Sequence, residues 1–243
     1  MRNTVYYTGD FHGDVRELLY RFDGIILSER DIIVVLGDAG LNYFFNDRDR
    51  KVKDLLNRRG VEVLCVHGNH EMRPQSISSY HEETWHGGTV YVEKAYPNIK
   101  FAKDGEIYEL GGKRCIAIGG AYSVDKFYRL AHGLKWFANE QPDSEIKARV
   151  EDRLERERWQ IDLVLSHTCP AKYIPTEAFL PGIDQSAVDN STEAWLDKIE
   201  DKLDYKLWLC GHWHINKRVD RLNFLYKSVM TSEEASEYCG EKD

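Results

Sequence analysis

Residues 31–38 read Asp-Ile-Ile-Val-Val-Leu-Gly-Asp and carry the strongest structural signal in the chain. An unbroken apolar run of this length is typical of a strand that is buried on both faces, as in parallel sheets covered by helices. Helical patterns flank it at residues 14–22 and 47–59, and similar strand patterns occur at residues 3–8 and 61–66. This alternation of strand and helix predicts parallel βαβ units in the first third of the chain.

The rest of the chain predicts a second group of strands. The expected elements are short strands at 89–92, 99–102, 106–110, 114–118, 161–165 and 207–210, helices at 145–158 and 191–203, and a hairpin at 217–228. No linker rich in Pro, Gly or Ser interrupts them, and a length of 243 residues is consistent with one domain. We therefore expect a single α/β domain over residues 1–231, with two sheets and with helices outside them.

The charge balance is acidic. Acidic residues outnumber basic residues by 41 to 33, which gives a formal net charge of −8. Residues 232–243 contribute −4 of this charge, and we expect them to form an acidic C-terminal tail. The body of the protein is only mildly acidic, and extended nucleic acid is not a favoured partner because contacts with phosphates need Lys and Arg.

The chain contains five cysteines, an odd number, and no Cys-x-x-Cys motif. No apolar run reaches the roughly 18 residues that a membrane helix needs, and the first residues do not resemble a signal peptide. We therefore expect a protein of the reducing cytoplasm with no membrane partner. Nothing in the sequence pattern indicates an oligomeric state.

Five short segments share one design, in which an apolar strand leads into Gly or Ser and then into side chains that can bind metal. They are Gly9-Asp10-Phe11-His12, Gly37-Asp38, Gly68-Asn69-His70-Glu71, Ser166-His167 and Gly211-His212-Trp213-His214. Open α/β sheets place their functional sites at the carboxyl ends of strands. Alternate residues of an extended segment point the same way, so Asp10 and His12 can present two ligands to one point. The small residues before the ligands allow the backbone and an ion to approach closely.

The donors in these segments are aspartate, asparagine and histidine, without cysteine. Oxygen and imidazole donors without thiolate suit Mn, Fe or Zn better than Mg or Ca. A carboxylate such as that of Asp38 can bridge two cations about 3.5–4 Å apart, as in two-metal hydrolytic sites. Each segment alone is compatible with a structural histidine or an ordinary turn. Five of them at strand ends in one chain favour a metal centre.

In their order along the chain, these segments resemble the motifs of the calcineurin-like metallophosphoesterase superfamily: Asp-x-His, Gly-Asp, Gly-Asn-His-Glu, His and Gly-His-x-His. The resemblance spans residues 9–214. It implies two packed mixed β-sheets flanked by helices, in a four-layer α/β/β/α arrangement. It also implies an enzyme that hydrolyses a phosphate ester with two bound divalent transition-metal ions.

The resemblance assigns a role to each residue. Seven residues would be metal ligands. One metal would be held by Asp10, His12 and His214, and the other by Asn69, His167 and His212. Asp38 would bridge the two metals. A hydroxide that bridges the metals would attack the phosphorus. His70 would bind no metal and would act as the general acid that protonates the leaving alkoxide.

The second motif departs from that of protein serine/threonine phosphatases, which continue it as Gly-Asp-x-x-Asp-Arg. Leu41 and Asn42 stand where that Asp and Arg would be, which argues against that subfamily. Asn42 and Arg73 are the candidate substrate-binding residues. Arg73 is either a bidentate phosphate clamp or a solvated loop arginine. Residues 123–129 either line the cleft or begin an ordinary helix.

We favour a phosphomonoesterase. The alternative is a phosphodiesterase that acts on small nucleotide or nucleic-acid diesters. A catalytically inactive scaffold of the same fold is a third reading, and it would predict eroded ligands or a missing acid, whereas every ligand type and His70 are present.

Overall fold

The structure is a computed structural model that describes residues 4–238 and 240. Its first sheet, sheet A, has seven strands. In spatial order they are β13 (Val229–Thr231), β1 (Val5–Thr8), β2 (Ile32–Val35), β3 (Glu62–Cys65), β6 (Ile99–Ala102), β5 (Gly88–Glu93) and β4 (Tyr80–Trp85). The central strands β1, β2, β3 and β6 pair in parallel, and the outer ones pair antiparallel. The apolar runs of the first third thus form the parallel centre of this sheet.

Sheet B has six strands. In spatial order they are β11 (Lys217–Val219), β12 (Leu222–Phe224), β10 (Asp204–Cys210), β9 (Gln160–Ser166), β8 (Lys113–Ile118) and β7 (Ile107–Leu110). Strands β12, β10, β9 and β8 are parallel neighbours, and β11 and β7 pair antiparallel at the two edges. Both sheets are therefore mixed, as expected.

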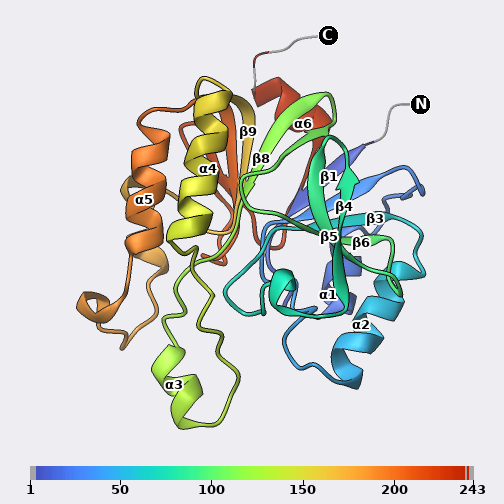
Figure 1. The fold of residues 1–243 in the computed structure, drawn as a ribbon, viewed down its shortest axis with the longest axis horizontal. Coiled ribbons are helices and arrows are strands. Elements are labelled where there is room, and N and C mark those ends of the chain that lie inside the picture. The colour runs from blue at the N-terminus through green and yellow to red at the C-terminus, as the bar shows by residue number, and fades with distance from the viewer. Residues whose placement is uncertain (1–3, 239, 241–243) are drawn as a thin grey trace.

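Helices cover the outer face of each sheet (Figure 1). The helices α1 (Val15–Arg21) and α2 (Asp47–Asn57) pack on sheet A, and α4 (Ser144–Arg156) and α5 (Ser191–Glu200) pack on sheet B. A third apolar cluster, which includes Val34, Leu64, Leu165 and Leu209, fills the space between the sheets. The four-layer α/β/β/α prediction is confirmed.

The first helix is fixed next to the segment that contains Asp10. The side chain of Asp14 caps α1 by accepting a hydrogen bond from the N–H of Glu17 at 3.1 Å. Arg21, in the last turn of α1, donates to the carbonyl oxygens of Gly9 at 2.8 Å and Asp10 at 2.5 Å. These bonds tie the turn after β1 to the helix that follows it.

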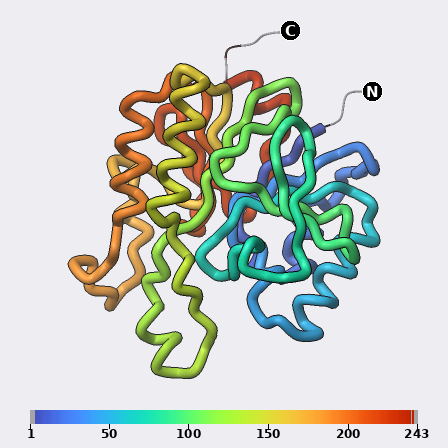
Figure 2. Tube along the Cα trace, viewed as in Figure 1, coloured from blue at the N-terminus to red at the C-terminus, as the bar shows by residue number. Residues whose placement is uncertain are grey.

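Of two elements in the middle of the chain, the strand β4 was not among the expected elements, whereas the helix α3 (Lys126–Ala131) agrees with the expectation that a helix begins within residues 123–129. Strand β4 forms an edge of sheet A and is largely polar, with His81, Glu82 and Glu83 in its centre, so it lacks the apolar run of a buried strand. The helix α3 lies in a segment that extends away from both sheets, yellow-green in Figure 2.

The segment that we expected to be an acidic tail begins with a packed helix, α6 (Ser232–Tyr238). The hydroxyl of Ser232 accepts a hydrogen bond from the N–H of Val5 at 3.2 Å. Ala235 is buried in the core between the sheets. The boundary predicted at residue 231 therefore falls inside the fold, because small residues on one face of an otherwise acidic helix allow it to pack. Residues 239 and 241–243 lie outside the described part of the chain.

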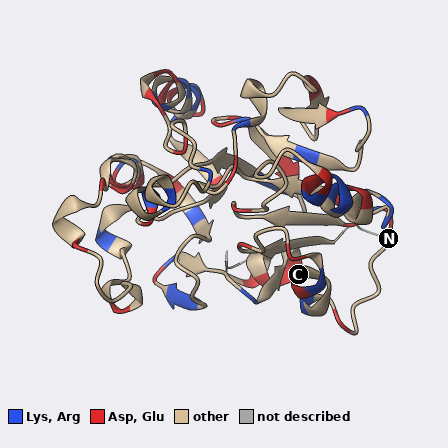
Figure 3. Cartoon of the chain, turned by 90° about the horizontal axis from the view of Figure 1, so that it is seen from below, with Lys and Arg blue, Asp and Glu red and all other residues tan. Residues whose placement is uncertain are grey.

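Charged residues of both signs are interspersed over the view in Figure 3. None of the helices in residues 4–238 is both long enough and apolar enough to cross a membrane. Cys65, Cys169 and Cys210 are free and buried, and Cys115 is buried.

Candidate metal centre

The expected ligands come together at the carboxyl ends of five strands. The loops after β1, β2 and β3 of sheet A hold Asp10, Asp38 and Asn69. The loops after β9 and β10 of sheet B hold His167 and His212. Both sheets thus contribute to one site.

Asp10, His12 and His214 form one group of potential ligands. The Nε2 atom of His214 lies 3.2 Å from Oδ2 of Asp10 and 3.1 Å from Nε2 of His12. The hydrogen bond with Asp10 raises the pKa of His214 above its ordinary value, while burial acts in the opposite direction. A carboxylate and two imidazoles that converge in this way form a donor set suited to a transition-metal ion.

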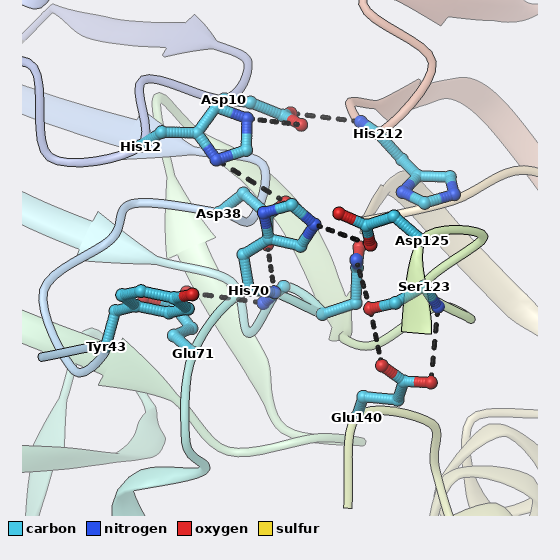
Figure 4. A network of polar contacts seen from close by, with 12 residues as sticks. Asp10, His12, Asp38, Tyr43, His70, Glu71, Ser123, Asp125, Glu140 and His212 are labelled. Atoms are coloured by element: carbon cyan, nitrogen blue, oxygen red, sulfur yellow. Dashed lines mark hydrogen bonds and ion pairs between the residues drawn. The ribbon is translucent and has the colours of Figure 1, made fainter. Parts of the chain in front are cut away.

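His167 and Asn69 form the second group. Nδ1 of His167 lies 2.8 Å from the carbonyl oxygen of Leu36, which favours the tautomer that carries its proton on Nδ1 and its lone pair on Nε2. That Nε2 atom lies 2.8 Å from Oδ1 of Asn69. The amide is oriented by Ser123, whose hydroxyl oxygen accepts from Nδ2 at 2.9 Å and whose hydroxyl donates to Glu140 at 2.5 Å (Figure 4).

In this second group, two electron-pair donors therefore face each other without a proton between them. His167 is fully buried, and Asn69 is 3% exposed. Two lone pairs that face each other in such a place repel one another unless a cation lies beside them. A metal ion that binds both atoms would remove this repulsion, so the residues present fit a metal.

Asp38 lies beside His12 and His70 (Figure 4). Its Oδ2 atom is 3.8 Å from Nδ1 of His12 and 3.9 Å from Nδ1 of His70, and its Oδ1 atom is 3.7 Å from Nε2 of His167. Burial alone would raise the pKa of Asp38, but the neighbouring histidines outweigh it and hold the pKa well below the ordinary value. The carboxylate is therefore ionised, and its two oxygens face different groups.

His212 takes part in a different way. The backbone N–H of His212 donates to Oδ1 of Asp10 at 3.0 Å, and the centroid of its ring lies 4.9 Å from that of the His167 ring. Burial, followed by the influence of His167, lowers the pKa of His212 to about 3, so the ring is neutral and keeps a lone pair at pH 7. Within the described residues, the compact groups of ligand atoms do not include its ring nitrogens.

Two of the small residues noted in the sequence allow the ligands to approach. A Cβ atom on Gly68 would lie 2.0 Å from Oδ1 of Asp38, and one on Gly211 would lie 2.3 Å from Oδ1 of Asp10. No side chain fits in either place. The glycines thus make room for the neighbouring ligand, which refines the expectation that they make room for an ion.

Four candidate ligands adopt the left-handed backbone conformation that non-glycine residues rarely take. The φ angles are 48° for His12, 49° for Asp38, 66° for His212 and 52° for His214. Such conformations each cost on the order of 1–3 kcal/mol and gather at functional sites. They bend the chain sharply at the strand ends, so that ligands from successive positions point into one space.

The role predicted for Arg73 as a phosphate clamp is wrong. Its side chain is 2% exposed and forms an ion pair with Asp104. It also donates from Nε to the carbonyl oxygen of Asn139 at 2.8 Å. The guanidinium is thus occupied within the protein, and the alternative of a solvated loop residue is wrong as well.

The predicted substrate contact of Asn42 is also not supported. Asn42 is 1% exposed, and its Oδ1 atom accepts hydrogen bonds from Nζ of Lys53 at 2.9 Å and from the hydroxyl of Tyr80 at 3.0 Å. These partners turn the side chain toward the outer face of sheet A. Its role is to join α2 to the edge of that sheet.

Two residues on the α3 segment lie beside His70 instead. The Nη2 atom of Arg129 is 2.9 Å from both ring nitrogens of His70. Oδ1 of Asp125 is 4.0 Å from the Nε2 atom of His70. Arg129 also donates from Nε to Asp125 at 2.7 Å and contacts the hydroxyl of Tyr43 at 3.3 Å. The sequence signal was the spacing of an acid and an arginine four residues apart, which identifies a helical pair but not its target.

Two cavities meet at the metal centre. The larger has a volume of about 410 Å³ and is lined by His12, Asp38 and His70, among others. The smaller has a volume of about 340 Å³ and lies next to Tyr43 and Arg129, with His12 and His70 shared between the two. His12 and His70 are therefore accessible from both cavities, whereas Asp38, Asn69, His212 and His214 line only the larger one.

The chain belongs to the calcineurin-like phosphoesterase family, whose model matches residues 4–216. It is a metal-dependent phosphoesterase of that family, and the Asp and His groups described above supply a plausible metal site. Among curated proteins, none matches the sequence significantly.

Two solved structures share the fold. A phosphopantetheinyl hydrolase from Mycobacterium tuberculosis is 18% identical, with a TM-score of 0.51, over 97% of this chain and 92% of that one. The protein TT1561 of Thermus thermophilus is 14% identical, with a TM-score of 0.52, over 94% of this chain and 91% of that one. At these identities, the likeness concerns the fold alone.

Proposed function

We propose that this protein is a phosphomonoesterase that uses two divalent transition-metal ions, Mn, Fe or Zn. The observation that carries the proposal is the position of Asp38, whose two carboxylate oxygens face histidines of both ligand groups. Asp10, His12 and His214 would bind one ion. Asn69, His167 and His212 would bind the other.

When bound, two such ions neutralise charge on the phosphate and lower the pKa of water to generate a hydroxide nucleophile near neutral pH. The chain contributes the ionised Asp38, the neutral ring of His212 and a second histidine, His167, whose proton is held on Nδ1 by the carbonyl oxygen of Leu36. Each of these states leaves a lone pair directed into the site.

His70 is proposed as the general acid. The backbone N–H of His70 donates to Oδ1 of Asp38 at 2.7 Å, which fixes the backbone next to the metal ligands. Its ring projects between the two cavities, where the ester oxygen of a substrate would lie. A proton given from this ring to the leaving oxygen would avoid the release of a high-energy alkoxide.

Arg129 supports the preference for monoesters. Its guanidinium lies beside His70 and faces the smaller cavity. A terminal phosphate of a monoester carries two negative charges, and a second cation outside the metal centre would bind the extra charge. Arg129 thus takes the place that the sequence had suggested for Arg73.

The smaller cavity favours one alternative, a phosphodiesterase that acts on a small diester. A second organic group on the phosphorus would need space on the opposite side of His70, and a cavity of about 340 Å³ beside Tyr43 and Phe44 offers it. An inactive scaffold is disfavoured because all seven ligand residues and His70 are present. The buried free thiols of Cys65, Cys169 and Cys210 are compatible with a cytoplasmic location.

The test is to load the purified protein with Mn²⁺, count bound metal, and compare hydrolysis of p-nitrophenyl phosphate with that of bis(p-nitrophenyl) phosphate. We expect two ions per chain, faster turnover of the monoester, and loss of both ions and activity in the Asp38→Asn variant. Unchanged metal content and rate in Asp38→Asn would overturn the bridging role. Faster turnover of the diester would replace the monoesterase by the diesterase.

A further inference from the structure

The larger cavity has a wall that the metal chemistry does not use. It extends from the metal centre over six apolar side chains, which we call the apolar wall: Phe179, Leu180, Ile183, Val188, Trp213 and Ile215. The first four belong to the long connection between β9 and α5, and the last two follow β10. The wall therefore begins at the histidines of the metal centre and continues outward from them.

The wall is open rather than collapsed onto itself. Leu180 is 60% exposed, and the rings of Phe179 and Trp213 are 6.2 Å apart at an interplanar angle of 31°. A volume of about 410 Å³ lies within the usual range of small-molecule sites, which are mostly apolar with a few polar groups at one end. Apolar surface held open beside polar ligands is typical of a binding site.

The charges around this cavity distinguish among possible substrates. Its lining, within the described residues, contains no Lys or Arg. Apart from Asp38, the acids that line it are Asp125 and Glu193. Glu193 is buried, and among the described residues this wall offers no cation that could offset a further negative charge. An anionic leaving group, such as one with a second phosphate or a carboxylate, would meet no counter-charge here.

We propose that the substrate is a phosphate ester whose leaving group is an uncharged alkyl or aryl group bound along the apolar wall. This inference rests on the proposed function. The phosphate lies at the metal centre, and His70 stands at the inner end of the wall. A hydroxide derived from water would form a new bond to phosphorus while the bond between phosphorus and the ester oxygen breaks. His70 would give its proton to that oxygen, so that the apolar alcohol leaves along the wall and inorganic phosphate is the other product.

The experiment measures binding and hydrolysis separately. Binding of methyl-, butyl- and hexylphosphonate to the Mn²⁺-loaded protein is measured by calorimetry, because phosphonates are not cleaved. We expect the affinity to rise roughly two- to fourfold for each added methylene, on the scale of burying a methylene group. 3-Phosphonopropanoate, which ends in a carboxylate, should bind more weakly than butylphosphonate. Hydrolysis of the matching alkyl phosphates, whose leaving groups have similar acidity, should follow the same order in kcat/KM.

Variants of the apolar wall test whether the dependence of binding on chain length arises there. Leu180→Asn changes an exposed position and should reduce the dependence on chain length without a folding defect, and Ile183→Asn should do so more strongly. Ile26→Asn, at a position that is 95% exposed and outside the cavity, is the matched control and should keep the dependence. An unchanged chain-length dependence in both wall variants would overturn the inference.

The two proposals can fail independently. In one outcome, the protein hydrolyses p-nitrophenyl phosphate and yet binds all phosphonates equally. In another, it hydrolyses this ester but binds 3-phosphonopropanoate more tightly than butylphosphonate. Either result would overturn this inference and leave the proposed function intact. A clear chain-length dependence of binding without hydrolysis of any ester would overturn the proposed function. Absence of both binding and hydrolysis would overturn both.

Discussion

At the scale of single residues, a variant of His70 can test the proposed proton transfer separately from metal binding. The backbone N–H of His70 donates a hydrogen bond to the side chain of Asp38. A change of the His70 side chain should therefore leave this bond in place. We expect His70→Asn to keep both metals and to lower kcat by roughly 10²–10⁴, the usual contribution of general acid catalysis. Metal analysis and steady-state kinetics of alkyl phosphates check this expectation.

The leaving group provides the control for His70. Nitrophenolate needs little protonation, so the loss in His70→Asn should be much smaller for p-nitrophenyl phosphate than for an alkyl phosphate. An equal loss for both substrates would assign His70 to phosphate binding instead of proton transfer.

Arg129 is the second residue that can be tested alone. Arg129→Ala should lower kcat/KM for monoesters by about 10- to 100-fold, on the scale of about 1.5–3 kcal/mol for a hydrogen bond to a charged group. Inhibition by inorganic phosphate should weaken in parallel, and diesters should be less affected. Arg129→Lys should restore only part of the loss, because lysine keeps the charge but not the fork of donors.

Lys126 is the matched control for Arg129. It belongs to the same short helix, but its amine lies over the ring of Trp136 at 4.2 Å from the centroid. Lys126→Ala should therefore leave monoester kinetics and phosphate inhibition unchanged. A similar loss in Lys126→Ala and Arg129→Ala would mean that α3 acts through its fold and not through one cation.

The same residues show what a sequence can reveal about a site. The ligand segments were recognisable because each follows its strand directly, so local pattern and position in the fold coincide. Arg73 was misleading because it is only three residues from His70, whereas its guanidinium turns away to Asp104, 31 residues further on. Arg129 is 59 residues from His70, and its approach depends on how the α3 segment folds back, which local sequence does not encode.

At the scale of elements, apolar strands were predictable and polar ones were not. The runs in β1, β2 and β3 are buried on both faces, and they could be located to within two residues. Strand β4 and the acidic helix α6 lie at the periphery and carry few apolar residues, so their formation depends on what they pack against.

Helix α6 gives the prediction at this scale. Ala235 is 1% exposed and packs in the core between the sheets, so Ala235→Asp would bury an unpaired charge. We expect the free energy of unfolding to fall by about 3 kcal/mol or more in urea denaturation. Deletion of residues 232–243 should likewise destabilise the protein, contrary to the behaviour of a free tail. Glu237→Ala, at an exposed position of the same helix, is the control, and a similar loss there would contradict the packing argument.

At the scale of the whole molecule, the metal centre joins the two sheets. Its candidate ligands come from sheet A at Asp10, Asp38 and Asn69 and from sheet B at His167 and His212. Ions that bind only the folded state should stabilise it by about 2.7 kcal/mol at a free concentration of 100 times Kd. This corresponds to a rise in Tm on the order of 5–10 °C for a chain of this size.

Thermal unfolding with Mn²⁺, with a chelator, and in Asp38→Asn measures this effect. The wild-type protein should lose the added stability on chelation, and Asp38→Asn should gain little from the metal. Identical melting temperatures of the wild-type protein with metal and with chelator would contradict the metal centre as a link between the sheets.

The separation of the ligands along the chain has a consequence for biosynthesis. His12 and His214 face each other across 202 residues of sequence. At about 5–20 residues per second, a ribosome needs roughly 10–40 s to make the chain between them. During that time the nascent protein can bury the first strands, but it still lacks the last two of the seven candidate ligands, His212 and His214. If these residues bind the metal as proposed, we expect metal insertion to be a late event that follows emergence of the last motif.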